Sequence, residues 1–166
     1  MIVVSNTSPL TNLAAIGQFD LLQSLYKSIH IAQGVWDELN HDGKKWPGSY
    51  EVSHATWIER HSVENKALVT ALESDLDLGE SETIALALEL QADLVLLDEK
   101  EGRRVAKRLE LPVIGVVGIL LEAKANKLVD RLLPQLREQA QRREKISLII
   151  LVRLENEIAR RYLNFT

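Results

Sequence analysis

The 166-residue sequence has no cysteine, few aromatic residues and no excess of positive charge. The absence of cysteine excludes disulfide bonds and thiolate-bound metals. A formal net charge of −4 argues against a protein that binds nucleic acid through overall charge alone. No apolar run approaches the roughly 20 residues that a membrane-spanning helix needs, and the first residues do not resemble a secretory signal. We therefore expect a cytoplasmic protein with no membrane segment.

Hydrophobic residues make up 46% of the chain, which suffices for a core in one domain of this length. Short apolar runs alternate with amphipathic segments, a pattern typical of an α/β domain with a largely parallel sheet. Strands are predicted at residues 2–4, 29–31, 58–63, 94–97 and 113–115. Helices are predicted at residues 9–16, 20–26, 34–40, 66–73, 80–90 and 103–109, and again from residue 116 on, with breaks near Asn126 and Pro134. We expect one domain over residues 1–166, with a helical extension from about residue 131.

Two of the predicted strands end in a polar residue. Asn6 follows the first strand within the segment Ser5-Asn6-Thr7-Ser8, and Asp98 follows the apolar run at 94–97 directly. In an open parallel sheet, residues just beyond the carboxyl ends of strands line the crevice where ligands bind. The two side chains are therefore expected to face one site, to which one contributes a carboxylate and the other an amide.

Helix periodicity separates the acidic residues into candidate ligands and surface residues. At about 100° per residue, Glu80 shares the apolar face of its helix, whereas Glu82 and Glu89 are predicted to point toward solvent. The same argument places Glu38 beside the apolar residues of its helix, with Asp37 outside. Two simpler interpretations remain open: Glu80 as a favourable charge at a helix N-terminus, and Glu38 as an ordinary surface residue.

The four candidates are all oxygen donors, namely Asn6, Glu38, Glu80 and Asp98. Oxygen donors without histidine or cysteine suit a hard cation, Mg²⁺ or Mn²⁺ rather than Zn²⁺. Acidic clusters of this kind hold cations that activate water for phosphodiester cleavage.

Four motifs, taken in order, resemble those of the PIN domain family. They are Asn6-Thr7-Ser8-Pro9-Leu10 after the first strand, Val35-Trp36-Asp37-Glu38-Leu39, Leu78-Gly79-Glu80-Ser81-Glu82-Thr83, and Leu96-Leu97-Asp98-Glu99 with Gly102-Arg103. The sequence most resembles a prokaryotic branch of the family, close to the toxin nucleases of toxin/antitoxin pairs. The similarity covers most of residues 1–130.

The resemblance implies a PIN-like three-layer sandwich, with a central, mostly parallel sheet flanked by helices. It also implies an endoribonuclease that depends on Mg²⁺ or Mn²⁺. The family's acidic ligands correspond to Asn6, Glu38, Glu80 and Asp98, with Glu82 as the alternative to Glu80, and Ser8 matches a supporting hydroxyl. RNA, a small antitoxin protein and a second copy of the chain in a homodimer are the partners that this resemblance implies.

Asn6 departs from the family pattern, because an amide oxygen can bind Mg²⁺ but neutralises none of its charge. The alternative function is accordingly a PIN-like module with little or no activity that binds RNA or a protein. Arg103, Arg104 and Lys107 follow the Asp98 loop and are candidates for binding RNA phosphates, although they equally suit a solvated helix face.

The predicted last helix, at residues 147–162, carries more apolar residues than one packing face requires. Such a surface suits contact with a second copy or with a partner protein. It equally suits a helix that closes the core of the monomer.

Overall fold

The computed structural model describes residues 1–41, 46–128, 132–141 and 145–163. Its centre is a five-stranded sheet in the order β3-β2-β1-β4-β5, in which each neighbouring pair of strands is parallel. The strands are β1 (Val3–Ser5), β2 (Ile29–Ala32), β3 (Ile58–His61), β4 (Leu94–Leu96) and β5 (Val113–Ile114). The predicted parallel α/β sheet is confirmed.

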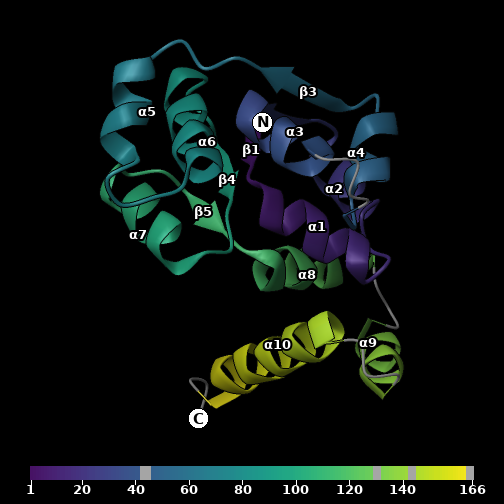
Figure 1. Ribbon diagram of the computed structural model, residues 1–166. Helices are drawn as coiled ribbons and strands as arrows, with labels where there is room; N and C mark the ends of the chain where they lie inside the picture. The colour runs from purple at the N-terminus through teal and green to yellow at the C-terminus, as the bar shows by residue number, and fades with distance from the viewer. Residues whose placement is uncertain (42–45, 129–131, 142–144, 164–166) are drawn as a thin grey trace.

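Helices cover both faces of this sheet, as Figure 1 shows. They are α1 (Thr7–Ala15), α2 (Leu21–Tyr26), α3 (Gln33–Asn40), α4 (Ser49–His54), α5 (Lys66–Leu72), α6 (Leu78–Glu89), α7 (Lys100–Arg108), α8 (Val116–Ala125), α9 (Leu132–Gln141) and α10 (Lys145–Leu163). Helical connections are required because parallel strands cannot be joined by tight turns.

Two apolar cores lie on opposite faces of the sheet. One joins β-strand residues such as Val3 and Ile31 to α1, α2, α3 and α8. The other joins Val4 and Ala32 to α5, α6 and α7. Since side chains alternate between the two faces of a strand, neighbouring residues of β1 and β2 supply both cores. The three-layer arrangement follows directly from this alternation.

The structure corrects several predicted boundaries. Helix α1 begins at Thr7 rather than Pro9, and its N-cap is Asn6, whose side chain makes no capping hydrogen bond. Helix α4 was not predicted, and residues 42–45, which precede it, lie outside the described chain. Pro134 does not interrupt a helix, because it lies in the first turn of α9, where a missing N–H costs no helical hydrogen bond.

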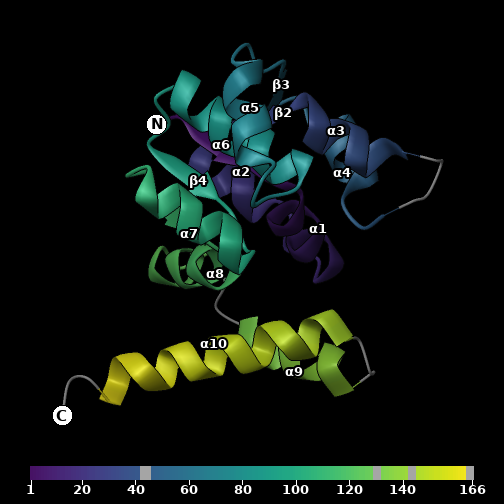
Figure 2. The same cartoon turned by 60° about the vertical axis from the view of Figure 1, so that its left-hand side comes forward.

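The C-terminal helices α9 and α10 pack against each other, and α10 also contacts α8 and α1 (Figure 2). Ile150, Leu151 and Leu154 of α10 are buried in the larger core. The interpretation that this helix closes the core of the monomer is therefore confirmed for one of its faces, while Leu148, Ile149 and Val152 are exposed. Among the described residues, no helix has the length and apolarity to cross a membrane.

Candidate functional site

Asn6 lies at the carboxyl end of β1, at the start of α1. Its backbone N–H donates to the carbonyl of Leu96 in β4 over 3.0 Å, which extends the sheet pairing by one residue. The side chain is only 4% exposed. Its Oδ1 lies 3.4 Å from the hydroxyl of Thr83 on α6, so the amide faces the helix that carries Glu80.

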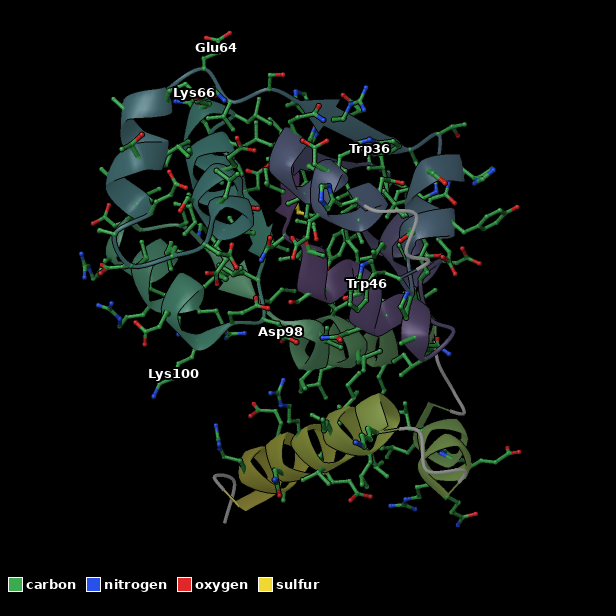
Figure 3. The ribbon with its side chains drawn as sticks, in the orientation of Figure 1. Trp36, Trp46, Glu64, Lys66, Asp98 and Lys100 are labelled. Carbon is green, nitrogen blue, oxygen red and sulfur yellow. The ribbon has the colours of Figure 1, made fainter. Side chains whose placement is uncertain are left out.

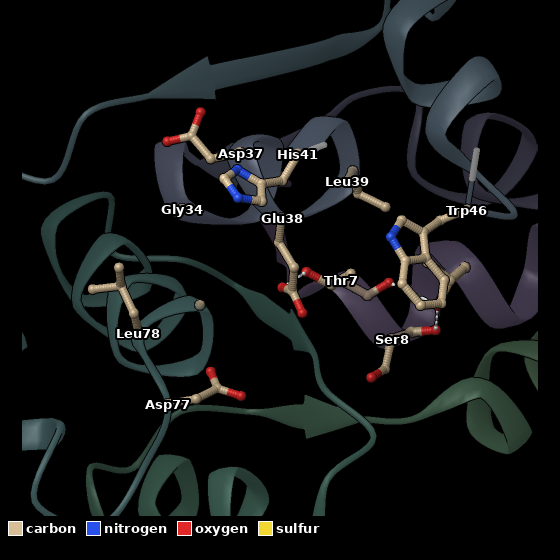
Figure 4. Close-up of a pocket in the computed structure, with 12 residues that line it drawn as sticks. Thr7, Ser8, Gly34, Asp37, Glu38, Leu39, His41, Trp46, Asp77 and Leu78 are labelled. Atoms are coloured by element: carbon tan, nitrogen blue, oxygen red, sulfur yellow. Dashed lines mark hydrogen bonds between the residues drawn. The ribbon is translucent and has the colours of Figure 1, made fainter. Parts of the chain in front are cut away.

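Glu38 approaches the same region from α3. Its Oε2 accepts a hydrogen bond from the hydroxyl of Thr7, at the start of α1. Figure 4 shows the Glu38 carboxylate directed toward the adjacent Thr7. Glu38 is itself an exposed residue. Glu38 thus approaches the start of α1, next to Asn6, and its role as a metal ligand stays a prediction.

Gly79 marks the point where several of these oxygens converge. A Cβ atom at this position would lie 3.2 Å from Glu38 Oε2, 3.5 Å from Asn6 Oδ1 and 3.5 Å from Asp77 Oδ1. The absence of a side chain thus lets an amide and two carboxylates gather beside the first turn of α6. Asp77 was not among the predicted site residues, and its position as N-cap of α6 explains why it faces the cluster.

Glu80 has two roles in this arrangement. It completes a capping box with Asp77, in which each side chain accepts a hydrogen bond from the other's backbone N–H. However, its Oε1 is buried and has no hydrogen-bond partner. Burial raises the pKa of the Glu80 carboxyl, and the hydrogen bond from the Asp77 backbone opposes this shift. The pKa is raised further by the nearby acidic groups of Asp77, Glu99 and Glu38. The capping interpretation is correct but leaves one oxygen unexplained.

Glu99 is an acidic residue of the site that the sequence analysis missed. Its Oε1 accepts a hydrogen bond from the Ser8 hydroxyl, and its Oε2 is buried without a partner. Ser8 therefore donates to an acidic side chain, and its role in supporting a metal site stays a prediction. The signal present in the sequence was that Glu99 directly follows Asp98; the structure adds that Glu99 is the N-cap position of α7.

Asp98 points to a different set of neighbours. Its carboxylate accepts hydrogen bonds from Asn12 Nδ2 at 3.1 Å and from the backbone N–H of Val116 at 3.3 Å. It also lies 3.7 Å from a guanidinium nitrogen of Arg153 on α10. Figure 3 shows Asp98 beside α8. Its role as a metal ligand stays a prediction.

Glu82 does not face solvent, and that prediction was wrong. Glu82 is only 7% exposed, because other elements surround α6 on nearly all sides. Its Oε2 accepts a hydrogen bond of 2.7 Å from the backbone N–H of Gly34, and Oε1 lies 3.6 Å from Lys66 Nζ. Glu82 therefore ties α6 to α3 and to α5.

Two cavities flank the acidic residues. The first, of about 690 Å³, is lined by Glu38, Asp77, Ser8, His41 and Trp46 among others (Figure 4). Trp46 is 53% exposed, unlike Trp36 and Trp57, which pack against the core. His41 and Trp46 were not predicted from the sequence to be site residues, and the tertiary structure brings both to the lining of this cavity.

The second cavity, of about 530 Å³, is lined by Asp98 and by four basic residues, Lys100, Arg103, Arg153 and Arg160. Of the three predicted phosphate-binding residues, Arg103 lines this cavity. Arg104 and Lys107 are exposed elsewhere on α7, and Arg104 pairs with Glu101 at 2.8 Å. The cavity therefore accounts for one of the three basic residues.

The donor set suits a hard divalent cation, since it combines carboxylates and an amide and includes two buried oxygens without hydrogen-bond partners. In the described part of the chain, no three of these carboxylates have oxygen atoms within 4.8 Å of one another. The acidic side chains would therefore move closer together to share one ion.

A family model described as DUF3368, PIN domain, matches residues 2–153. The chain belongs to the PIN domain family. PIN domains generally form a metal-dependent nuclease fold and typically bind divalent metals. Among curated proteins, none matches this chain.

Proposed function

We propose that this protein is an endoribonuclease of the toxin type that uses Mg²⁺ or Mn²⁺ to cleave RNA phosphodiesters. The observation that carries the proposal is the buried, unpartnered Oε1 of Glu80, which lies among other acidic groups. Buried carboxylates normally have a compensating partner, because an uncompensated buried charge is strongly destabilising. A divalent cation would compensate several of them at once.

Asn6, Glu38 and Glu80 would hold the cation together with an acid of the β4–α7 loop, for which Asp98 and Glu99 are the two candidates. When bound, the cation supplies charge neutralisation at the phosphate and lowers the pKa of water. The chain itself orients the donors: Thr7 holds Glu38, and Ser8 holds Glu99. Such hydroxyl partners fix the ligand side chains before a substrate binds.

RNA binding is supported by what lies on each side of the acidic residues. The basic residues of the second cavity could bind backbone phosphates, which position a nucleic acid without reading its sequence. On the other side, the half-exposed indole of Trp46 offers a face on which a base could stack. A single strand would then cross the acidic cluster between them.

The toxin-like resemblance also supports a small antitoxin and a second copy of the chain as partners, and we include both in this proposal. The exposed apolar residues of α10, namely Leu148, Ile149 and Val152, are a surface on which such a protein could bind.

The main experiment measures cleavage of a mixed RNA pool with and without Mn²⁺. The wild-type protein should cleave only with the metal, and Glu80→Gln and Glu38→Gln should each lower the rate at least about 100-fold, in line with the loss of an electrostatic contribution at a catalytic site. Glu73→Gln is the matched control, because Glu73 is an exposed acid at the end of α5. Cleavage that is equal in all variants would come from a contaminant and would overturn the proposal.

The alternative, a module that binds RNA without cleaving it, has its own outcome in the same experiment. It predicts RNA binding without cleavage, and binding that Glu80→Gln leaves unchanged. Under either function, Trp46→Ala should weaken RNA binding by about 1–3 kcal/mol, the usual contribution of a stacked base. Tyr50→Ala, which removes an exposed aromatic ring on α4, should not.

A further inference from the structure

A second group of metal-binding side chains lies away from the acidic cluster, on strands β2 and β3. His30 Nδ1 lies 2.9 Å from His61 Nε2. Glu59 Oε2 lies 3.7 Å from His30 Nδ1 and 4.0 Å from His61 Nε2. Across the described residues, this is the one group of three histidine or acidic side chains whose ligand atoms all lie within 4.8 Å of one another.

The register of the two strands explains the grouping. His30 pairs with Glu59, and Ala32 pairs with His61. Paired residues of parallel strands point to the same face, and so do residues two apart on one strand. The three side chains therefore project together from the face of the sheet that α5 and α6 cover, to which Ala32 also belongs. Strand β3 is the edge of the sheet (Figure 1).

The group is partly shielded from water and remains accessible. The side chain of His30 is 14% exposed and that of His61 is 29% exposed, whereas Glu59 is 58% exposed. Burial lowers the pKa of His30. The charge of Glu59 raises this pKa, and His61 lowers it further. A neutral imidazole is the form that binds metals.

We propose that His30, Glu59 and His61 form a binding site for a borderline transition metal such as Zn²⁺. Zinc binds histidine nitrogen at about 2.0–2.1 Å in tetrahedral geometry, which places two ligand nitrogens about 3.3 Å apart. The two imidazoles would separate by a few tenths of an ångström, and the exposed Glu59 side chain would move inward by a similar distance. Water fills the fourth position.

This site differs in chemistry from the acidic cluster. Two imidazoles and one carboxylate suit Zn²⁺, whereas Mg²⁺ and Mn²⁺ prefer sites made only of oxygen donors. The metal would bridge β3 to β2 at the sheet edge. Zn²⁺ would bind only the folded protein and would therefore raise its stability by mass action. It would also anchor β3, an edge strand of only four residues.

The experiment titrates Zn²⁺ into the full-length protein by calorimetry, in millimolar Mg²⁺ to occupy any oxygen-donor site. The wild-type protein should bind one equivalent and melt at a higher temperature with Zn²⁺. His61→Ala and Glu59→Gln should each weaken binding at least about tenfold, because even the loss of an outer-shell partner costs a metal site 10–100-fold. His54→Ala, which removes an exposed histidine on α4, is the matched control.

Cobalt provides a second readout, since Co²⁺ in a site with nitrogen ligands and low coordination number gives visible absorption bands. These bands should appear with the wild-type protein and His54→Ala, and disappear with His61→Ala. Glu59→Gln changes an exposed side chain and should fold normally. If His61→Ala is unstable, the Zn²⁺ affinity of Glu59→Gln still tests the proposal. Absence of Zn²⁺ binding, or binding that neither variant weakens, would overturn the proposal and leave a simple imidazole–imidazole hydrogen bond.

Discussion

The hydroxyl of Thr83 lies 3.4 Å from Asn6 Oδ1 and 2.7 Å from the carbonyl oxygen of Gly79. A hydroxyl has one proton to donate, and the shorter distance assigns it to Gly79. The Asn6 oxygen is therefore only weakly satisfied by Thr83, although it is buried. The Asn6 oxygen is therefore available to a cation. Because the site is buried, a charge introduced at residue 6 should also affect the stability of the protein.

Asn6→Asp should tighten Mn²⁺ binding and increase RNA cleavage, because it adds a carboxylate beside Glu38 and Glu80. Without metal, the buried charge has no compensating partner and should lower stability by about 1–3 kcal/mol. Calorimetric Mn²⁺ titration and thermal melting in chelator measure the two effects. Gln23→Glu adds the same charge at an exposed position of α2 and serves as the control. Unchanged metal affinity in Asn6→Asp would exclude Asn6 as a ligand.

The neighbouring acids Asp98 and Glu99 can be separated by a matched pair of variants. The resemblance predicts that Asp98→Asn weakens Mn²⁺ binding, whereas the geometry favours Glu99→Gln, because Glu99 raises the pKa of Glu80 and has an unpartnered oxygen. Whichever of the two residues binds the metal, its substitution should lower Mn²⁺ affinity at least about tenfold. Even the loss of a residue that only hydrogen-bonds to a metal ligand has an effect of this size. If Asp98 is instead structural, its variant should lower the melting temperature, since Asn12 and the Val116 N–H would lose a charged acceptor.

Glu82→Ala should destabilise the protein by about 1–3 kcal/mol, because the Gly34 N–H would lose its acceptor in a partly buried position. The contribution of exposed Lys66 should be small. Urea denaturation measures the loss, and Glu101→Ala, which breaks an exposed pair on α7, is the control. Mn²⁺ affinity should stay unchanged in Glu82→Ala; a lower affinity would restore Glu82 as the alternative to Glu80.

Tyr26 provides a pH test of the packing between α2 and α8. Its hydroxyl donates to Glu122 Oε2 over 2.7 Å. Burial raises the pKa of Tyr26 above its ordinary value of 10.0, and the hydrogen bond and charge of Glu122 raise it further. Above pH 10 the unfolded chain loses this proton while the folded chain keeps it, so stability should fall as pH rises, by up to about 1.4 kcal/mol per pH unit.

Tyr26→Phe should lack this component of the pH dependence and should be less stable at neutral pH by about 1 kcal/mol, the usual contribution of one hydrogen bond. Denaturant titrations at pH 8, 10 and 11 would measure both effects. Equal slopes for the two proteins above pH 10 would contradict the prediction.

The sequence predicted the order and nature of the elements well, because apolar periodicity reflects burial on one or two sides. The five strands and most of the helices lie within a few residues of their predicted positions. Helix α4 was missed because six residues beside a segment rich in glycine and lysine give too short a pattern to detect. The sequence also predicted that Asn6, Glu38, Glu80 and Asp98 share one site, since strand ends and helix faces limit where such side chains can lie. In the structure, Asn6 and Glu38 both lie beside Gly79, and Glu38 raises the pKa of Glu80. Asp98 instead contacts Asn12 and Val116, so its place in the site stays a prediction.

The tertiary structure decided how the remaining acids are used. Glu82 was predicted to be exposed because one helix face was assumed to be solvated, whereas α3 and α5 bury it. Asp98 and Glu99 are adjacent in sequence but have different partners. Asp98 accepts from Asn12 and from the backbone N–H of Val116, and Glu99 accepts from Ser8. The grouping of His30, Glu59 and His61 depends on the register of two strands that are far apart in the chain. Such pairings arise from packing between distant segments, which local periodicity does not encode.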